Sequence, residues 1–260
     1  LERNYHINAI QFYDWMWRHE KLIKRTGGVI DTSWTDWSGK TINWQTLQNQ
    51  ISAAHNLNMS AMAYDIIYGA LDNYQATSGV DPQWGLYDDV NHANQWNFNF
   101  GDAYPNVHMY MFNPANSSWQ NHISGQFNDA LNNGFDGMHL DQLGQNDNKK
   151  DYSGQAVDLP NTFAGYVNNI KSAFPAGKKV TYNIVNGGVN TWGAYNVAHF
   201  SNSDFDYSEQ WDNATTYQNL KDEVTSFKTL DGNKAVVLAA YMNYYEDNGP
   251  RTEAETATRN

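Results

Sequence analysis

The hydrophobic and polar positions of this chain alternate between two periods, one typical of amphipathic helices and one typical of buried strands. The helical period is clear over residues 43–56, where Trp44, Leu47, Ile51 and Ala54 recur every three or four positions. The same spacing, with its flanking stop and start residues, predicts further helices over residues 117–131, 159–174, 192–197 and 217–227.

Short apolar or alternating runs lie between these helices and predict strands. They cover residues 6–13, 59–64, 107–112, 134–141, 179–186, 203–209 and 235–243. Strands that alternate with helices predict a parallel sheet, and crossovers of this length favour a closed barrel over an open sheet. We therefore expect an α/β fold, a (β/α)8 TIM-type barrel, with about seven of its eight βα units in this chain.

Two segments depart from this regular alternation. Residues 66–105 are rich in Asn, Asp, Gly and aromatic side chains, and a connection of this length inside a compact domain is usually functional. We expect a substrate-facing excursion with a short helix near residues 89–95. The polar stretch 246–260 offers no eighth strand, so we expect residues 1–260 to be one catalytic barrel domain truncated at its C-terminal end.

Composition and charge exclude several classes of function. The chain has no cysteine, so it has neither a disulfide framework nor thiolate chemistry. A net charge of −12 argues against nucleic acid as a partner, because phosphate binding needs clustered Lys and Arg. There is no apolar run long enough for a membrane span. The eight histidines are scattered without the spacing of a zinc site, so we expect no metal and no cofactor.

Aromatic residues make up 15% of the chain, with 10 Trp and 17 Tyr, and Asn and Gln are abundant. Flat rings with a polar edge suit the C–H faces of sugars, and amides offer both a donor and an acceptor to hydroxyl groups. The same composition also suits an aromatic core and a weakly charged surface. Composition alone therefore leaves carbohydrate binding open.

Two acidic residues end predicted strands, where parallel barrels present their catalytic groups. Asp141 shares a strand face with His139, and its alternative role as a helix cap is weakened because the next helix begins only near Pro160. Glu209 is in phase with Tyr207, and an acid set among aromatic rings has a raised pKa. The alternative for Glu209 is an ordinary surface residue in a loop.

Asp141 and Glu209 on two strands of one barrel would face each other across its mouth. Carboxyl groups about 5–5.5 Å apart are the geometry of a retaining glycosidase, so we predict Asp141 as the nucleophile and Glu209 as the acid/base. Further candidates that would contact the substrate are Asp14, Tyr13, Asp65, His139, Gln142, Gln210 and Trp211. Candidate stacking platforms for sugar rings are Tyr13, Trp34, Trp37, Trp84 and Trp211.

Three motifs carry a resemblance to a known family: Gln-Phe-Tyr-Asp-Trp-Met-Trp-Arg-His at 11–19, Phe-Asp-Gly-Met-His-Leu-Asp-Gln-Leu-Gly at 135–144, and Asp-Tyr-Ser-Glu-Gln-Trp at 206–211. They resemble glycoside hydrolase family 66, which contains endo-dextranases and cycloisomaltooligosaccharide glucanotransferases. The resemblance implies a (β/α)8 catalytic domain acting on α-1,6-glucan with retention of configuration. The resemblance also implies roles for three residues of this sequence: Asp141 matches the family's nucleophile, Glu209 matches its acid/base, and Asp14 matches an acid near the sugar at the cleavage site. It also implies an immunoglobulin-like domain before the barrel and a β-rich domain after it.

From these observations we expect a retaining endo-dextranase that cleaves internal bonds of dextran and isomaltooligosaccharides. The first alternative is a cycloisomaltooligosaccharide glucanotransferase on the same scaffold, and the second is a non-catalytic carbohydrate-binding barrel. We expect a secreted or cell-surface bacterial protein that works as a monomer.

Overall fold

The computed structural model describes residues 7–101, 104, 106–144, 148–185, 194–210, 216–232 and 234–240. Its centre is parallel β-structure in two adjoining sheets. The first pairs β1 (Ala9–Phe12), β6 (Ser60–Ile66), β10 (Gly137–Asp141) and β11 (Lys179–Tyr182) in that order, and the second pairs β12 (Ile184–Val185), β13 (Asp206–Gln210) and β14 (Val236–Ala240). Only Asn183 separates β11 from β12, so the strands follow one another in chain order from β1 to β14.

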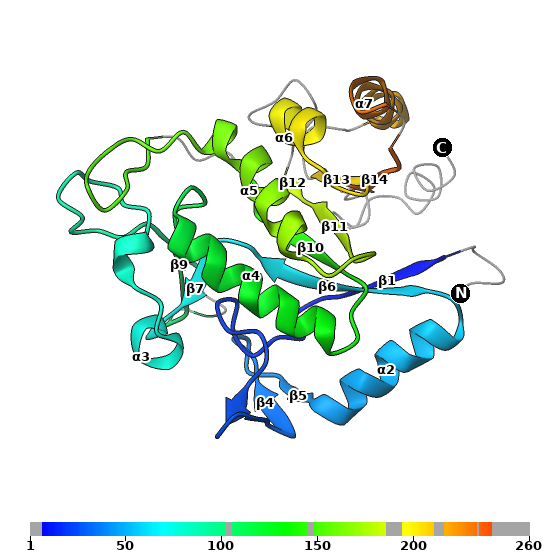
Figure 1. The fold of residues 1–260 in the computed structure, drawn as a ribbon. Coiled ribbons are helices and arrows are strands. Elements are labelled where there is room, and N and C mark those ends of the chain that lie inside the picture. Colours follow the sequence, from blue (N-terminus) through cyan, green and yellow to red (C-terminus); the bar gives the residue numbers. More distant parts are fainter. Residues whose placement is uncertain are drawn as a thin grey trace, which may run out of the picture.

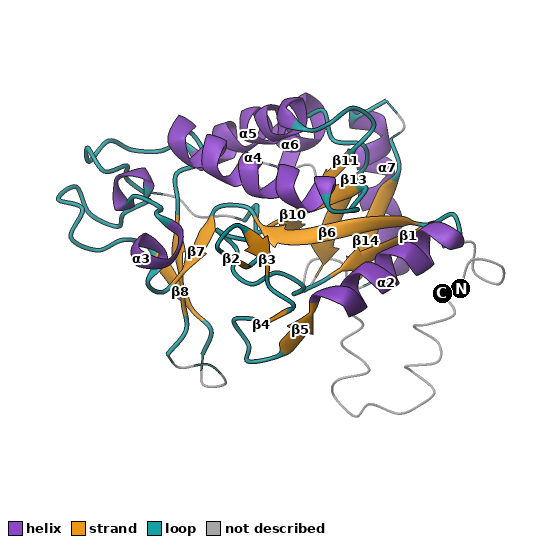
Figure 2. Ribbon diagram, turned by 60° about the horizontal axis from the view of Figure 1, so that its bottom comes forward, coloured by secondary structure: helices purple, strands orange, loops and turns teal. Residues whose placement is uncertain are grey.

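Five helices follow the parallel strands, as the periodicity predicts. They are α2 (Trp44–Asn56), α4 (Ser117–Asn132), α5 (Leu159–Ala173), α6 (Ala194–Phe200) and α7 (Tyr217–Leu230). Figure 1 shows α4 and α5 in front of the central strands. Figure 2 shows α4, α5 and α6 together on one side of the strands and α2 on the other side. Side chains at the N-caps of α2, α4, α5 and α7 fix where these helices begin: Asn116, for example, accepts hydrogen bonds from the backbone N–H groups of Ser118 and Trp119.

Aromatic side chains fill the space between α4 and the strands. Trp119 of α4 is fully buried and stacks on Phe112 with ring centroids 4.5 Å apart. Its indole N–H donates to the hydroxyl of Tyr166 of α5, 2.9 Å away. A buried Trp needs such a partner, because an unpaired N–H inside the core is destabilising. Part of the high aromatic content therefore serves this core.

The predicted third parallel strand, residues 107–112, is placed differently. It forms β9 (His108–Met111), which pairs antiparallel with β7 (Gly69–Leu71) and β8 (Asn97–Asn99) in a separate sheet. β6 pairs directly with β10 instead. The prediction was wrong because an apolar run identifies a strand but not its partner. Among the described residues the parallel structure therefore has six strands, with β11 and β12 counted as one, rather than seven.

The excursion over residues 66–105 contains more structure than the sequence indicated. Besides β7 and β8 it holds α3 (Tyr74–Ser78) and a 3₁₀ turn, η1 (Pro82–Trp84). The helix expected near residues 89–95 is absent, and that stretch is a series of turns in which the Asp89 carboxylate accepts three backbone N–H groups. The long loop after β1 likewise contains two hairpins, β2 (Arg25–Thr26) with β3 (Val29–Ile30) and β4 (Ser33–Thr35) with β5 (Thr41–Asn43). The tail 246–260 lies outside the described residues.

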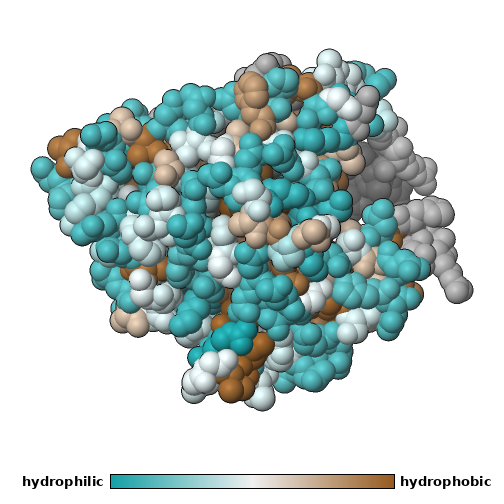
Figure 3. All heavy atoms as spheres, viewed as in Figure 1, coloured by the Kyte–Doolittle hydropathy of each residue, from teal (hydrophilic) through white to brown (hydrophobic). Residues whose placement is uncertain are grey.

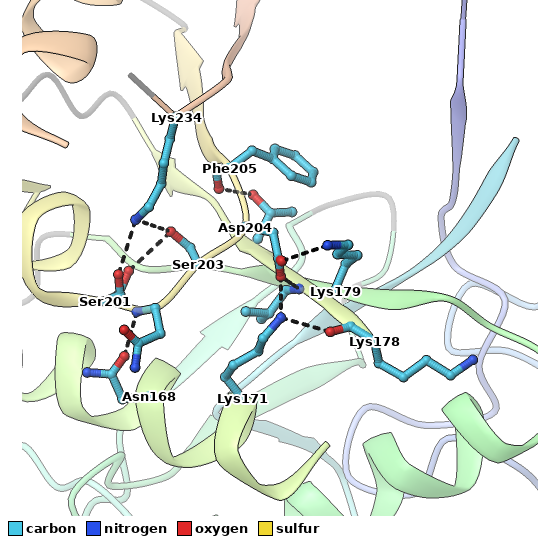
Figure 4. Close-up of polar contacts among 12 residues, drawn as sticks. Asn168, Lys171, Lys178, Lys179, Ser201, Ser203, Asp204, Phe205 and Lys234 are labelled. Atoms are coloured by element: carbon cyan, nitrogen blue, oxygen red, sulfur yellow. Dashed lines mark hydrogen bonds and ion pairs between the residues drawn. The ribbon is translucent and has the colours of Figure 1, made fainter. Parts of the chain in front are cut away.

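A polar cluster fastens the N-terminal ends of β11 and β13 (Figure 4). Lys179 in this cluster is opposite Gly137, the first residue of β10, whereas Asp141 is the last residue of that strand. The carboxylate of Asp204 forms ion pairs with Lys171 of α5 and with Lys179, and accepts the backbone N–H of Val180. Burial alone would raise the pKa of Asp204, but these donors hold it below its ordinary value. The cluster thus connects α5 to the N-terminal ends of β11 and β13.

The surface over α4 and α5 is mainly hydrophilic, with apolar side chains scattered singly across it (Figure 3). No helix in the described part of the chain combines the length and the apolar character that crossing a bilayer requires.

Candidate active site

The register of the parallel strands brings one set of side chains to a common face. His139 is opposite Tyr64 of β6 and opposite Thr181 of β11. Since side chains alternate along a strand, Asp141 lies on the same face, with Asn183 beside it. On β13 the same face carries Tyr207 and Glu209, because the ring of Tyr207 contacts His139 at 4.5 Å. We call this the inner face.

Asp141 ends β10 and is 3% exposed. Its Oδ2 accepts the hydroxyl of Tyr64 at 2.6 Å, and its Oδ1 accepts the side-chain amide of Asn183 at 2.7 Å. Burial raises the pKa of Asp141, and these donors, together with the backbone N–H of Gln142, oppose that rise. The result is a buried carboxylate held in a fixed orientation by three hydrogen bonds.

Asn183 also contacts Glu209, the second predicted acid. The amide Nδ2 donates to Glu209 Oε2 at 3.0 Å as well as to Asp141 Oδ1 at 2.7 Å. Because both bonds share one nitrogen, the two carboxylate oxygens lie less than about 6 Å apart, below the separation of about 6.5–9.5 Å typical of inverting glycosidases. The structure thus brings together the two acids that the sequence predicted to meet.

Aromatic and neutral groups surround these two acids. Tyr13 follows β1, is 58% exposed and stacks on Tyr64 at 3.8 Å. Burial lowers the pKa of His139 to about 3, so its imidazole is neutral at physiological pH. Burial and the two carboxylates raise the pKa of Tyr207 to about 12. Among the described residues, rings that are uncharged at neutral pH therefore flank the two acids.

Two residues beside the site have left-handed backbone conformations that are uncommon outside glycine. Asp14 at the end of β1 has φ +46°, and Gln142 directly after Asp141 has φ +72°. The carboxylate of Asp14 accepts the indole N–H of Trp37 at 3.3 Å, and burial raises the pKa of Asp14. Trp37 in turn stacks on Phe100 at 4.5 Å. This hydrogen bond and the stacking on Phe100 hold Asp14 and Trp37 in place beside Tyr13, at the edge of the site.

Other predicted contact residues are not on the inner face. Asp65 is fully buried on the opposite face of β6, where its carboxyl contacts His19 Nδ1 at 2.7 Å. Gln210 is 2% exposed and bonds to Ser208, also on the outward phase. Trp34 is 3% exposed and packed in the core, so its predicted role as a stacking platform is wrong. Trp211 lies outside the described residues.

Tyr64 and Asn183, the two side chains that hold Asp141, were not predicted from the sequence. Tyr64 lies one position before Asp65, the acid chosen at the end of that strand. Strand alternation offered a signal, because a residue in phase with the inner face is a better candidate than its neighbour. For Asn183 the sequence gives only an amide inside a predicted strand. Among the described residues, no group of three or more His, Asp or Glu side chains could hold a metal ion.

Comparison with known proteins identifies the family. The sequence profile of Glycosyl hydrolase family 66 matches residues 1–256. A cycloisomaltooligosaccharide glucanotransferase of Niallia circulans is 48% identical over 263 residues, covering 99% of this chain and 27% of that protein. A dextranase of Streptococcus salivarius is 24% identical over 263 residues, covering 93% of this chain and 30% of that protein. The chain thus spans about a quarter to a third of the length of these relatives.

Solved structures agree with the sequence comparison. The crystal structure of a cycloisomaltooligosaccharide glucanotransferase of Paenibacillus sp., complexed with cycloisomaltoheptaose, superposes with a TM-score of 0.88 at 50% identity, covering 94% of this chain and 35% of that one. A GH31 family sulfoquinovosidase from E. rectale, with a TM-score of 0.50 at 13% identity over 92% of this chain and 40% of that one, shows a likeness of fold alone. On the profile match and the 48% identity, this chain belongs to glycosyl hydrolase family 66.

Proposed function

We propose that this chain carries the catalytic centre of an enzyme that cleaves α-1,6-glucosidic bonds and transfers the released glucosyl chain, with retention of configuration. The observation that carries the proposal is the pair of carboxylates on one amide. Asp141 and Glu209 both bond to Asn183 Nδ2, so they are close enough to act on the two sides of one glycosidic bond. A complete (β/α)8 barrel belongs to the same proposal.

In the first step, Glu209 donates a proton to the glycosidic oxygen while Asp141 attacks the anomeric carbon. The bond from that carbon to the leaving oxygen breaks, and a β-glucosyl ester of Asp141 forms. The hydroxyl of Tyr64, 2.6 Å from Oδ2, and the amide of Asn183 on Oδ1 keep the nucleophile oriented. The neutral ring of His139 adds no positive charge that would weaken it.

In the second step, Glu209 takes a proton from an incoming hydroxyl, whose oxygen attacks the anomeric carbon and releases Asp141. Two inversions give the α-configured product. Water as the acceptor gives hydrolysis, whereas a sugar 6-hydroxyl gives transfer. When that hydroxyl belongs to the other end of the same bound chain, the product is a cyclic isomaltooligosaccharide.

The choice between these outcomes rests on the comparisons. The sequence favoured an endo-dextranase, yet the glucanotransferase of Niallia circulans is 48% identical to this chain and the dextranase only 24%. These values support the glucanotransferase, the first alternative to the endo-dextranase that the motifs of the chain favoured. We therefore propose cyclising transfer on α-1,6-glucan as the main reaction and hydrolysis as the secondary one. Because polymeric dextran is too large to enter a cell freely, a secreted or cell-surface location fits this substrate.

Product analysis after incubation with dextran tests this proposal. The assay uses the natural polypeptide that carries this chain, together with its Asp141→Asn and Glu209→Gln variants. We expect cyclic isomaltooligosaccharides from the parent and a loss of turnover by at least about a thousandfold in each variant. Linear products alone would favour the dextranase. Full turnover in either variant would refute the assigned chemistry, and dextran binding without any turnover by the parent would favour a non-catalytic binding barrel.

A further inference from the structure

Asn183 occupies the single position that joins the two parallel sheets. β11 pairs with β10 and β12 pairs with β13, with Asn183 between them. Its backbone is bonded on both sides of Asp141: its N–H donates to Leu140 O at 2.7 Å, and its carbonyl accepts the N–H of Leu143 at 3.1 Å. The residue is thus fixed to the strand of the nucleophile by its main chain.

The side chain of Asn183 is fixed to the strand of the acid. The backbone N–H of Glu209 donates to Asn183 Oδ1 at 3.0 Å. A backbone N–H can only donate, so the amide oxygen must face it and the amide nitrogen must face the carboxylates. The amide oxygen of Asn183 therefore accepts the bond that fixes the orientation of the side chain. The amide nitrogen donates one hydrogen bond to Asp141 and one to Glu209.

Within the part of the chain that the structure describes, the other titratable side chains on the inner face carry no charge at neutral pH. They come from four elements: Tyr13 after β1, Tyr64 of β6, His139 of β10 and Tyr207 of β13. Burial lowers the pKa of His139 to about 3, and the pKa values of the three tyrosines are all raised. Among the described residues, neutral donors therefore stabilise negative charge on this face, and Asn183 is a donor common to both acids.

We propose that Asn183 is a positioning residue that sets the proton affinities of both carboxylates, in addition to their separation. This inference rests on the proposed function. The amide bond to Oδ1 favours the ionised form of Asp141, which the attack requires. The bond to Oε2 of Glu209 makes that oxygen the acceptor, so that the transferable proton resides on Oε1. Asn183 thus links the nucleophile to the acid through one shared donor group.

The pH profile of kcat/KM on dextran tests this inference, measured on the natural polypeptide and its Asn183→Ala variant. Removal of a donor from both anions raises both apparent pKa values. We expect both limbs of the bell-shaped profile to move to higher pH by about one unit. Asn183→Asp keeps the size of the side chain but replaces the donor with a third carboxylate, so we expect a larger shift in the same direction. Asn113, a buried amide that follows β9, provides the control: Asn113→Ala leaves both limbs unchanged.

A lower rate with both limbs unchanged, in either folded Asn183 variant, overturns the inference and indicates a merely structural role. Failure of the proposed function has a different signature, namely full turnover in Asp141→Asn. The titration of the two carboxyl groups, followed by isotope-edited NMR in the parent and in Asn183→Ala, tests the inference independently of turnover. We expect both apparent pKa values to be higher in the variant, and equal values in the two proteins would overturn it.

Discussion

Near the start of β13, the pKa of Asp206 is raised and that of Asp204 is lowered. The stability that each contributes therefore changes with pH in the opposite direction, which the substitution Asp206→Asn can test. Asp206 lies on the outward phase of β13, is fully buried, and accepts the hydroxyl of Tyr182 at 2.7 Å. Burial, together with the nearby Asp231, raises the pKa of Asp206 from its ordinary value of 3.8 to about 6. The native state therefore keeps a proton on this carboxyl at pH values where the unfolded chain has lost it.

The sign and size of the effect follow from proton linkage. Between pH 4 and pH 6 the native state holds more protons than the unfolded state, so the free energy of unfolding falls as the pH rises. A displacement of about 2 pH units corresponds to a loss of about 3 kcal/mol at most, complete above pH 6. The amide introduced by Asp206→Asn has no proton to release, and its oxygen can still accept the Tyr182 hydroxyl. We expect this variant to lack the part of the decline that Asp206 contributes.

Urea denaturation between pH 4 and pH 8, followed by tryptophan fluorescence, measures the effect without adding salt that would screen charges. The readout is the change with pH in the difference between variant and parent, because a constant offset has other causes. Asp204→Asn is the matched control. Ion pairing lowers the pKa of Asp204, so that residue contributes stability above pH 3.8 that is lost only as the pH falls below it. This control variant is less stable at neutral pH but keeps the decline of the parent between pH 4 and pH 6.

Parallel stability curves for the parent and Asp206→Asn from pH 4 to pH 7 would refute this account. Such a result would mean that Asp206 is ionised in the native protein at low pH. Its burial and the proximity of Asp231 would then not raise its proton affinity.

Two further substitutions test the site and the packing of the sheet. Tyr64→Phe removes the donor 2.6 Å from Asp141, so we expect the acidic limb of the activity profile to move up by about one pH unit; an unchanged limb would show that this hydrogen bond does not stabilise the anion. Gly137→Ala would place a methyl group 2.5 Å from the carbonyl oxygen of Lys179, and we expect the free energy of unfolding to fall by about 1–3 kcal/mol. The control for it is Gly165→Ala on α5, where a methyl group meets no atom within 4 Å; we expect a gain of about 0.5–1 kcal/mol in urea titrations, and equal effects of the two changes would contradict the packing argument.

Features that depend on local period and local chemistry could be predicted from the chain alone. The helical spacing of apolar residues located α2, α4, α5 and α7, since neighbours three and four apart share a helix face. Strand alternation placed Asp141 with His139 and Glu209 with Tyr207, because the two-residue period of a strand needs no knowledge of its partner. Acids at strand ends and the motifs around them then indicated the chemistry and the family.

The pairing of the strands and the meeting of distant side chains became known only from the folded chain. The run 107–112 has the composition of a strand, yet β6 pairs with β10 and leaves β9 to the antiparallel sheet. Tyr64 is 77 positions from Asp141 and Asn183 is 42 positions from it. Contacts at such separations depend on strand order and register, which arise from the packing of the whole domain and not from any local pattern. The two acids could be read from the chain, whereas the amide that joins them became visible only in the folded protein.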